Sequence, residues 1–196
     1  SLGDRIGFRA AGGLLMSRIS RIDRSRVAGA VRDTFERKIA EDGNIPNMYR
    51  VFAHRPWLLT TMDAHFAAVM GSGTVPMQLK GLLAILTSRL NRSEHCLHSQ
   101  IQLAAQTGVD ERKIAALPEV ENGPFDEKEL AALRYGLQVA RDPNGVSDAV
   151  FADLARLFTE SEIVEITCVV GLFSYFNRFN AALRVAPTQA EEGADS

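Results

Sequence analysis

Cysteine is scarce in this chain of 196 residues, which contains only Cys96 and Cys168. Two cysteines are too few for a disulfide-stapled domain, so a reducing, cytoplasmic setting is the default expectation. Long hydrophobic runs are also lacking, because none approaches the roughly 20 apolar residues of a membrane-spanning helix. Neither sign of charge dominates: the net charge is −2. The chain therefore has no overall basic field that would favour nucleic acid or an anionic membrane as a partner.

The composition is otherwise that of a soluble globular protein. Hydrophobic residues make up 46% of the chain and charged residues 23%, which suits one domain with an ordinary core, or at most two small domains. We expect residues 23–186 to form a single helical domain. Residues 1–22 are expected to be an N-terminal extension, either flexible or partly left by an expression vector, and residues 187–196 a flexible acidic tail.

Helical periodicity and capping residues run through the whole chain and predict an all-α fold. Asp23 is expected to cap a first helix that ends near residue 42. Capping boxes are predicted where Asp126 and Thr159 are each followed three residues later by glutamate. No segment alternates apolar and polar residues for long enough to predict a strand. The other predicted helices are 47–53, 56–70, 76–90, 94–107, 110–117, 126–141, 147–157 and 161–185.

The last predicted helix, 161–185, is apolar on most of its faces. Such a helix usually lies in the middle of a bundle or against a second subunit, and we expect a homo-oligomer of closed symmetry. Cys168 lies in this helix beside Val169 and is predicted to be a buried, unreactive thiol. His54 is predicted to lie at the surface, and His65 to be half-buried.

One short segment gathers the nucleophilic and polar residues, Ser93 to Gln100 (SEHCLHSQ). If Ser93 caps a helix, Cys96 lies in its first turn, where unpaired N–H groups and the positive end of the helix dipole favour a thiolate. At helical spacing Ser93, Ser99 and Gln100 share the face of Cys96 and could hydrogen-bond to its sulfur. This arrangement favours a reactive thiol.

Two histidines flank the cysteine, and three interpretations of the segment stay open. His95 adjoins Cys96, so its ring could approach the sulfur and activate the thiol. His95 and His98 have a spacing that allows two metal ligands, but no third ligand is evident nearby. Alternatively, Cys96 is a structural cysteine beneath a polar helix cap.

Three stretches of the chain carry a resemblance to a known family. They are GNIPNMYRVFAHRPWLL (43–59), SRLNRSEHCLHSQIQLAAQTGVDERKIAAL (88–117) and FNRFNAAL (176–183). Their order resembles the carboxymuconolactone decarboxylase-like superfamily, which includes alkylhydroperoxidase D and peroxidase-related proteins. The resemblance implies an all-helical fold of the alkylhydroperoxidase D-like type and assembly into a symmetric oligomer.

The peroxidase branch of this superfamily carries a Cys-x-x-Cys-x-x-x-His motif and a glutamate about fifteen residues before the second cysteine. The resemblance places the second cysteine at Cys96 and the first at Ser93. The motif histidine falls on Gln100, and the upstream glutamate falls near Gly81. His95 matches a histidine that alkylhydroperoxidase D has before its second cysteine. The motif is therefore degenerate, with one thiol and without two proton-relay groups.

The resemblance implies a peroxidase-related thiol oxidoreductase with an antioxidant role. Cys96 would be the nucleophile and His95 would activate it, with Ser93, Gln100 and His98 in support. Because Ser93 cannot form a disulfide with an oxidised Cys96, an external thiol or protein reductant is expected. We expect a small-molecule substrate, no cofactor, no metal, and neither nucleic acid nor membrane as partners.

Two alternatives to the thiol oxidoreductase stay open. One is a non-redox enzyme of the decarboxylase branch, acting on a small organic acid, with His95 or His98 as acid–base group. The other is a catalytically inactive member that serves as an oligomeric binding or structural protein.

Overall fold

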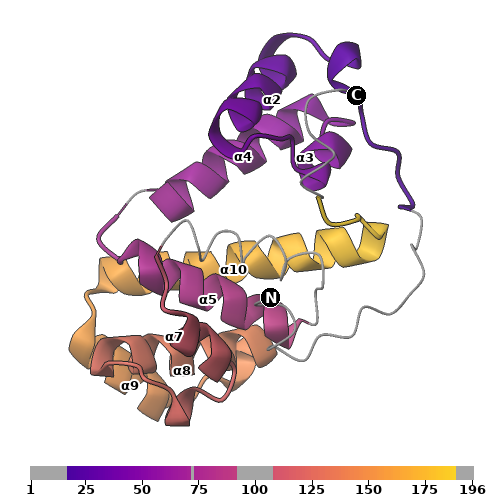
Figure 1. Ribbon diagram of the computed structural model, residues 1–196. Helices are drawn as coiled ribbons and strands as arrows, with labels where there is room; N and C mark the ends of the chain where they lie inside the picture. Colours follow the sequence, from indigo (N-terminus) through magenta and orange to yellow (C-terminus); the bar gives the residue numbers. More distant parts are fainter. Residues whose placement is uncertain (1–16, 72, 92–107, 189–196) are drawn as a thin grey trace.

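The computed structural model describes residues 17–71, 73–91 and 108–188, and every regular element within these ranges is a helix (Figure 1). The predicted all-α fold is thereby confirmed for the described part of the chain. The α-helices are α2 (Gly29–Asp42), α3 (Asn47–Phe52), α4 (Pro56–Gly71), α5 (Met77–Leu90), α7 (Glu111–Ala116), α8 (Glu127–Arg141), α9 (Asp148–Leu157) and α10 (Glu160–Leu183). Single turns of 3-10 helix lie at Arg24–Arg26, Val120–Asn122 and Pro143–Gly145.

Side-chain caps set the beginnings of two long helices, as predicted. The Asp126 carboxylate accepts a hydrogen bond from the Glu129 N–H at 2.8 Å, and the Glu129 carboxylate accepts one from the Asp126 N–H at 3.0 Å. Thr159 and Glu162 form the same reciprocal pair at the start of α10. Each capping box satisfies backbone N–H groups that the first turn of a helix leaves without partners.

The first predicted helix is shorter than the sequence indicated. Asp23 caps only the 3-10 turn, accepting a hydrogen bond from the Ser25 N–H at 2.7 Å. The chain is then extended at Val27, with φ −112° and ψ 153°. Gly29 has a left-handed φ of 56°, a conformation that glycine adopts without steric cost. The prediction of one helix from Asp23 was therefore wrong, because the chain turns before α2 begins.

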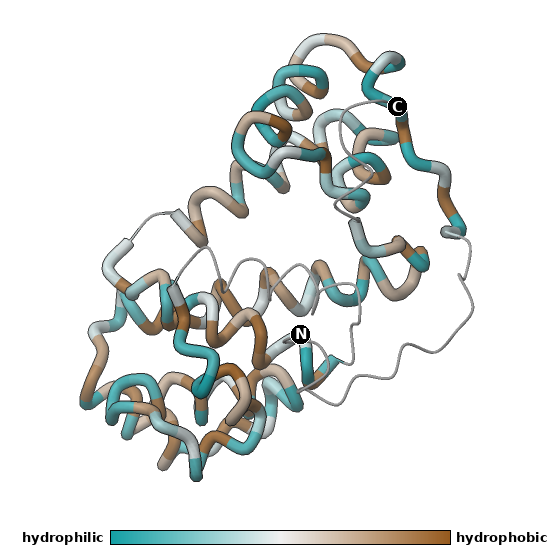
Figure 2. The backbone as a smooth tube through the Cα atoms, viewed as in Figure 1, coloured by the Kyte–Doolittle hydropathy of each residue, from teal (hydrophilic) through white to brown (hydrophobic). Residues whose placement is uncertain are grey.

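Helix α5 forms the centre of the core. All residues from Leu79 to Ser88 are buried, so the helix is covered on every side. It packs against α10 and α8, and α8 in turn packs against α9. Figure 1 shows α2, α3 and α4 grouped beside this set, and hydrophobic residues recur along α5 and α10 in Figure 2.

Helix α10 runs in the same direction as α5. Lys80 of α5 meets Glu165 of α10, and eight residues later Ser88 meets Asn177. One side of α10 is buried in this contact, whereas Val164 is 62% exposed on the other. The last helix therefore lies within the bundle, which is one of the two positions that the sequence predicted for it. The apolar side chain of Val164 remains exposed on its outer side.

The two ends of the described chain lie against α3 and α10. The Arg18 backbone N–H donates to the Leu183 carbonyl, and its guanidinium donates to the Ala182 carbonyl, both at 3.0 Å. The Asn47 N–H donates to the Thr188 hydroxyl at 2.8 Å. Residues 17–22 of the predicted extension are therefore docked on the helical domain, while residues 1–16 and 189–196 lie outside the described ranges.

Candidate functional site

The predicted thiol site lies outside the described residues, and it comprises Ser93, His95, Cys96, His98 and Gln100. The structure does describe the helix that leads into it. α5 ends at Leu90, and Asn91 follows as the cap. Because Cys96 comes five residues after Asn91 in the sequence, covalent geometry limits their Cα separation to about 17 Å in any conformation. The end of α5 is therefore the described region that chain connectivity ties to the cysteine.

Gly81 was expected near the position of the family's upstream glutamate, and the structure buries it in the middle of α5. A carboxylate does reach the neighbouring residue, but from another helix: Glu165 of α10 forms an ion pair with Lys80. Sequence reasoning missed this pair. In the sequence, the burial of the Lys80 side chain is indicated only by the apolar residues that surround it in α5.

The Lys80–Glu165 pair joins four parts of the fold. The Lys80 side chain is 2% exposed, and its ammonium also donates to the Val69 carbonyl at the end of α4, at 2.8 Å. The second Glu165 oxygen accepts hydrogen bonds from the N–H groups of Thr74 and Val75, at 3.2 and 3.4 Å. With its oxygens engaged in this way, Glu165 acts as a structural group that fixes α4, the following loop, α5 and α10.

A second buried polar group lies between the C-terminal parts of α5 and α10. We call it the amide cluster, and its residues are Ser88, Asn91, Asn177 and Asn180. The Ser88 hydroxyl donates to Asn177 Oδ1 at 3.1 Å. Ser88 and Asn91 share one face of α5, and Asn177 and Asn180 share one face of α10, because residues three apart are neighbours on a helix.

Three residues of the amide cluster are deeply buried, and Asn91 is half-buried. Exposure is 0% for Ser88, 1% for Asn177 and 3% for Asn180. Asn180 Nδ2 lies 3.5 Å from the Met48 sulfur of α3. The cluster contains hydroxyl and carboxamide groups and neither a carboxylate nor an imidazole, so it can donate and accept hydrogen bonds but cannot act as a general base near neutral pH.

Arg89 follows Ser88 in α5 and carries a partly buried positive charge. Burial lowers the pKa of its guanidinium, which nevertheless stays charged because the ordinary pKa of arginine is above 12. Nη1 donates to the Leu117 carbonyl, while Nη2 is buried and has no hydrogen-bond partner. Among the described residues Arg89 forms no ion pair with a carboxylate, unlike the deeply buried Lys80.

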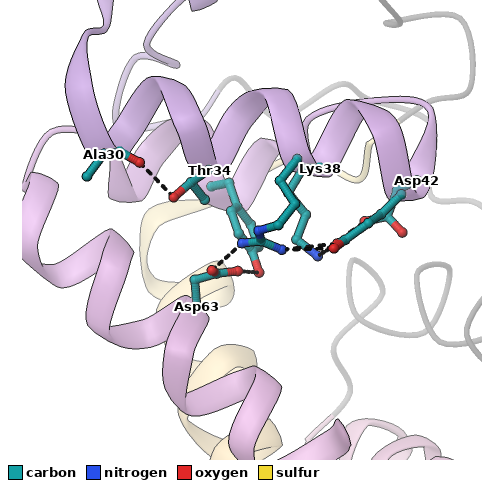
Figure 3. A network of polar contacts seen from close by, with 8 residues as sticks. Ala30, Thr34, Lys38, Asp42 and Asp63 are labelled. Atoms are coloured by element: carbon teal, nitrogen blue, oxygen red, sulfur yellow. Dashed lines mark hydrogen bonds and ion pairs between the residues drawn. The ribbon is translucent and has the colours of Figure 1, made fainter.

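A separate polar network joins α2, α3 and α4 (Figure 3). Asp63 accepts a hydrogen bond from the Tyr49 hydroxyl at 2.9 Å and pairs with Arg37. The Lys38 ammonium pairs with Asp42 and lies 5.5 Å from the centre of the Tyr49 ring. Burial, together with the Asp63 carboxylate, raises the pKa of Tyr49, so its phenol stays protonated. The charged members are paired with one another, and the network has a structural role.

The other residues that the sequence analysis singled out are His54, His65 and Cys168, and they lie at or near the surface. His54 is exposed, as predicted, and donates to the Ser20 carbonyl at 2.8 Å. His65 is exposed, so the prediction that it is half-buried was wrong. Cys168 was expected to be buried but is half-buried, because it lies one turn after the exposed Val164 on the outer side of α10.

The described residues form neither a metal-binding cluster nor a membrane-spanning helix. Within residues 17–71, 73–91 and 108–188, no three His, Cys, Asp or Glu side chains are grouped closely enough to hold a metal ion. No helix in the same ranges has the length and hydropathy needed to cross a membrane. His95 and His98, the predicted pair of metal ligands, lie outside these ranges.

The chain has relatives in sequence and in structure. Residues 56–136 match the model of the carboxymuconolactone decarboxylase family. The protein YnjA of Escherichia coli K12 is 25% identical over 108 residues, which are 55% of this chain. The chain spans 59% of the length of that relative.

Solved structures share the fold at low identity. The debrominase Bmp8, crystallised as a cysteine-to-alanine variant with 2,3,4-tribromopyrrole, gives a TM-score of 0.79 at 23% identity, covering 90% of this chain and 94% of that one. A peroxidase-related protein of Ralstonia eutropha JMP134 with an alkylhydroperoxidase AhpD core gives a TM-score of 0.77 at 18% identity, covering 90% of this chain and 94% of that one. A peroxidase-related protein of Silicibacter sp. TM1040 gives a TM-score of 0.76 at 21% identity, covering 85% of this chain and 91% of that one.

The family match runs from the start of α4 through Cys96 into α8, and of the three sequence stretches it contains 88–117 in full and the last residues of 43–59. The structural neighbours extend the similarity of fold to the N-terminal helices and to α10. Together these findings confirm the resemblance that the motifs predicted: residues 56–136 match the carboxymuconolactone decarboxylase family, and the described chain has the helical fold of the alkylhydroperoxidase D-like structures.

Proposed function

We propose that the protein is a one-cysteine thiol oxidoreductase that reduces a hydroperoxide or a related small oxidant. The observation that carries the proposal is the family match over residues 56–136, because this range contains the whole segment from Ser93 to Gln100. His95 and Cys96 are the two residues of that segment that agree with the peroxidase motif. The polar surroundings expected for Cys96 at a helix start favour its thiolate.

The proposed cycle needs one oxidant and two equivalents of an external thiol. The Cys96 thiolate attacks the outer oxygen of the hydroperoxide, the O–O bond breaks, and the alkoxide leaves as an alcohol after taking a proton. Cys96 is then a sulfenic acid. A first external thiol displaces water and forms a mixed disulfide, and a second thiol releases Cys96 and an external disulfide. A dithiol can supply both equivalents.

The neighbouring residues have distinct proposed roles. His95 accepts the thiol proton and returns it to the leaving oxygen, which is general acid–base catalysis. Ser93 and Gln100 hydrogen-bond to the sulfur, and His98 supports the site from the neighbouring face. These roles make the protein an antioxidant oxidoreductase, and we extend the proposal to a cytoplasmic location, where thiol reductants are abundant.

A substrate panel tests the proposal on the purified full chain. Hydrogen peroxide, an organic hydroperoxide and a brominated pyrrole are supplied with a dithiol, and oxidation of the dithiol is followed. Turnover with a hydroperoxide supports the proposal, and turnover with the brominated pyrrole alone would point to a different thiol reaction. If no oxidant modifies Cys96 and the thiol is alkylated slowly, with a near-normal pKa, the decarboxylase-branch and inactive alternatives replace the proposal.

Restoring the missing cysteine should restore part of the family chemistry. In the Ser93→Cys variant two sulfurs stand three residues apart, the spacing of redox-active dithiol motifs. We expect mild oxidant to produce an internal disulfide between the introduced thiol and Cys96, and a gain of weak dithiol-dependent peroxide turnover. Adding Gln100→His should raise the rate further, because a positioned proton-transfer group is typically worth about 10²–10⁴-fold.

Thiol counting after oxidation checks this expectation. Ser161→Cys, in the exposed first turn of α10, is the matched control and should keep all its thiols free. If the Ser93→Cys variant also keeps two free thiols at positions 93 and 96, the alignment of this segment with the family motif is wrong.

The subunits are also proposed to associate through exposed apolar side chains. Five large hydrophobic side chains in the described part of the chain are at least 45% exposed, those of Trp57, Leu58, Phe151, Val164 and Tyr175. Covering such residues removes apolar area from water, which is the main driving force of stable association. We expect sedimentation to show an oligomer at micromolar concentration.

Charge placed on the outer side of α10 tests this surface. Val164→Arg should shift the sedimentation profile toward the monomer, because a buried unpaired charge opposes association. Ala115→Arg, at an exposed position of α7, should leave the oligomer intact. A wild-type protein that stays monomeric at micromolar concentration contradicts the proposed association.

A further inference from the structure

One side of α10 carries uncovered residues at a regular spacing. We call it the outer stripe, and its residues are Ser161, Val164, Cys168, Gly171, Tyr175 and Arg178. Val164 is 62% exposed and Tyr175 46%, Cys168 is half-buried, and the other three are exposed. The intervals alternate between three and four residues, which is the spacing of the seam between two paired helices. The outer stripe therefore has the pattern of a helix-pairing surface that the described part of one subunit leaves open.

The outer stripe is self-complementary under a two-fold axis. Its centre lies midway between Cys168 and Gly171, and Val164 and Tyr175 stand at equal distances on either side of that centre. Two α10 helices that cross antiparallel at this point place Val164 of each copy against Tyr175 of the other. Contacts in which residue i meets j and j meets i are those of an isologous two-fold interface.

The side chains along the stripe fit this pairing. Cys168 and Gly171 at the centre are small, and a Cβ placed on Gly171 would meet no atom of its own subunit within 4 Å. Two helices can therefore approach closely at the centre, because the side chains at a contact set the distance between helix axes. Val164 and Tyr175 on either side are large and apolar, so that covering them removes apolar area from water.

Opposite charges at the two ends of α10 select the antiparallel direction. Glu160 lies one turn before Val164, and Arg178 lies nearly one turn after Tyr175. Both are exposed, and neither forms an ion pair with another described residue. An antiparallel pair brings Glu160 of each copy near Arg178 of the other, whereas a parallel pair would bring like charges together. Such complementarity fixes the register of an interface.

We propose that two copies of this chain pair through the outer stripe, with antiparallel α10 helices related by a two-fold axis between Cys168 and Gly171. The inference rests on the proposed association of the subunits and adds the partner, the direction and the register of one contact. It also places the second thiol of the chain at the centre of that contact. The pairing does not depend on the chemistry of Cys96.

Disulfide trapping measures the register. Val164→Cys and Tyr175→Cys are each made in a chain whose Cys96 and Cys168 are replaced by serine. The two proteins are mixed with diamide, which is reduced as it oxidises two thiols to one disulfide. A covalent heterodimer should form, because the facing positions allow the short Cα separation that a disulfide needs. Each protein alone should stay uncrosslinked, since positions 164 of two antiparallel copies lie about 16 Å apart along the helices.

A control mixture shows whether the crosslink is specific. Phe151→Cys, exposed on α9, replaces Tyr175→Cys in it and should give no heterodimer with Val164→Cys. Crosslinking of Val164→Cys with itself, or equal crosslinking in both mixtures, would overturn the antiparallel pairing. No crosslink in a protein that sediments as an oligomer would overturn the pairing and leave the association to another surface. A monomeric wild type would overturn both.

Charge reversal tests the ends of the contact. Arg178→Glu should raise the dissociation constant at least about tenfold, because two attractive pairs in each dimer become repulsive. Combining it with Glu160→Arg should restore the wild-type constant to within about threefold, since each pair is then attractive again. Arg141→Glu, at the exposed end of α8, is the matched control and should associate as the wild type does. A double variant weaker than Arg178→Glu alone would show that Glu160 and Arg178 do not face each other and would overturn the register.

Discussion

The Cys96→Ser variant is expected to lose hydroperoxide reduction, with a second-order rate constant lower by about a thousandfold or more. The thiolate is the electron donor in the proposed cycle, and a serine hydroxyl neither ionises near neutral pH nor forms a sulfenic acid. Dithiol-dependent consumption of an organic hydroperoxide measures the loss. Thermal unfolding of the variant should stay close to that of the wild type, which separates a chemical effect from a folding defect.

Cys168→Ser is the matched control for this result. Cys168 is half-buried in the middle of α10, away from any helix start, and so lacks the N-terminal dipole and unpaired N–H groups that lower a thiol pKa. The rate should stay within about twofold of the wild type, since neither thiolate stabilisation nor access favours this residue. Loss of activity in Cys168→Ser with retention in Cys96→Ser would reverse the assignment.

Glu165→Leu is expected to destabilise the fold by about 3–5 kcal/mol. The Lys80 ammonium, with a side chain that is 2% exposed, would lose the carboxylate of Glu165, which balances its buried charge. The N–H groups of Thr74 and Val75 would also lose an acceptor. Urea denaturation at a fixed protein concentration measures the change in the free energy of unfolding.

Two comparisons show that burial of the charge is the cause. Glu121→Leu removes the partner of Arg134 in an exposed pair whose glutamate side chain is 59% exposed, and it should cost no more than about 1 kcal/mol. The double variant Lys80→Met with Glu165→Leu should recover much of the loss, because apolar replacement of a buried pair is often neutral. Equal costs for Glu165→Leu and Glu121→Leu would refute the structural role of this pair.

Much of the fold was predictable because helix limits depend on local chemistry. The capping boxes at Asp126 and Thr159 bind backbone N–H groups within three residues of their own position, so the sequence alone contains the whole interaction. The first helix was predicted less well. Asp23 has the residue type of a helix cap, but the backbone turns at Val27 and Gly29, and this depends on how the segment docks against α3.

The buried polar contacts could not be derived in the same way. Lys80 lies 85 positions before Glu165 in the sequence, and Ser88 lies 89 before Asn177. Each pair forms only because α5 and α10 pack side by side, and no local rule links such distant residues. A signal did exist in the segment FNRFNAAL, where Asn177 and Asn180 recur at helical spacing inside an apolar helix. That pattern indicates buried carboxamides facing one neighbour.

The candidate thiol, by contrast, was identified from residue types and from family resemblance. Cys96 stands among Ser93, His95 and Gln100, a grouping that local sequence displays directly. The family match over residues 56–136 supports the same segment.

Trapping of the oxidised cysteine is the most direct test of the central claim, that Cys96 is the redox-active thiol. The native protein is exposed briefly to one equivalent of an organic hydroperoxide in the presence of a sulfenic-acid-specific reagent, then digested and analysed by mass spectrometry. The account predicts the adduct on Cys96 and almost none on Cys168. An adduct on Cys168 alone, or equal labelling of both cysteines, would contradict it.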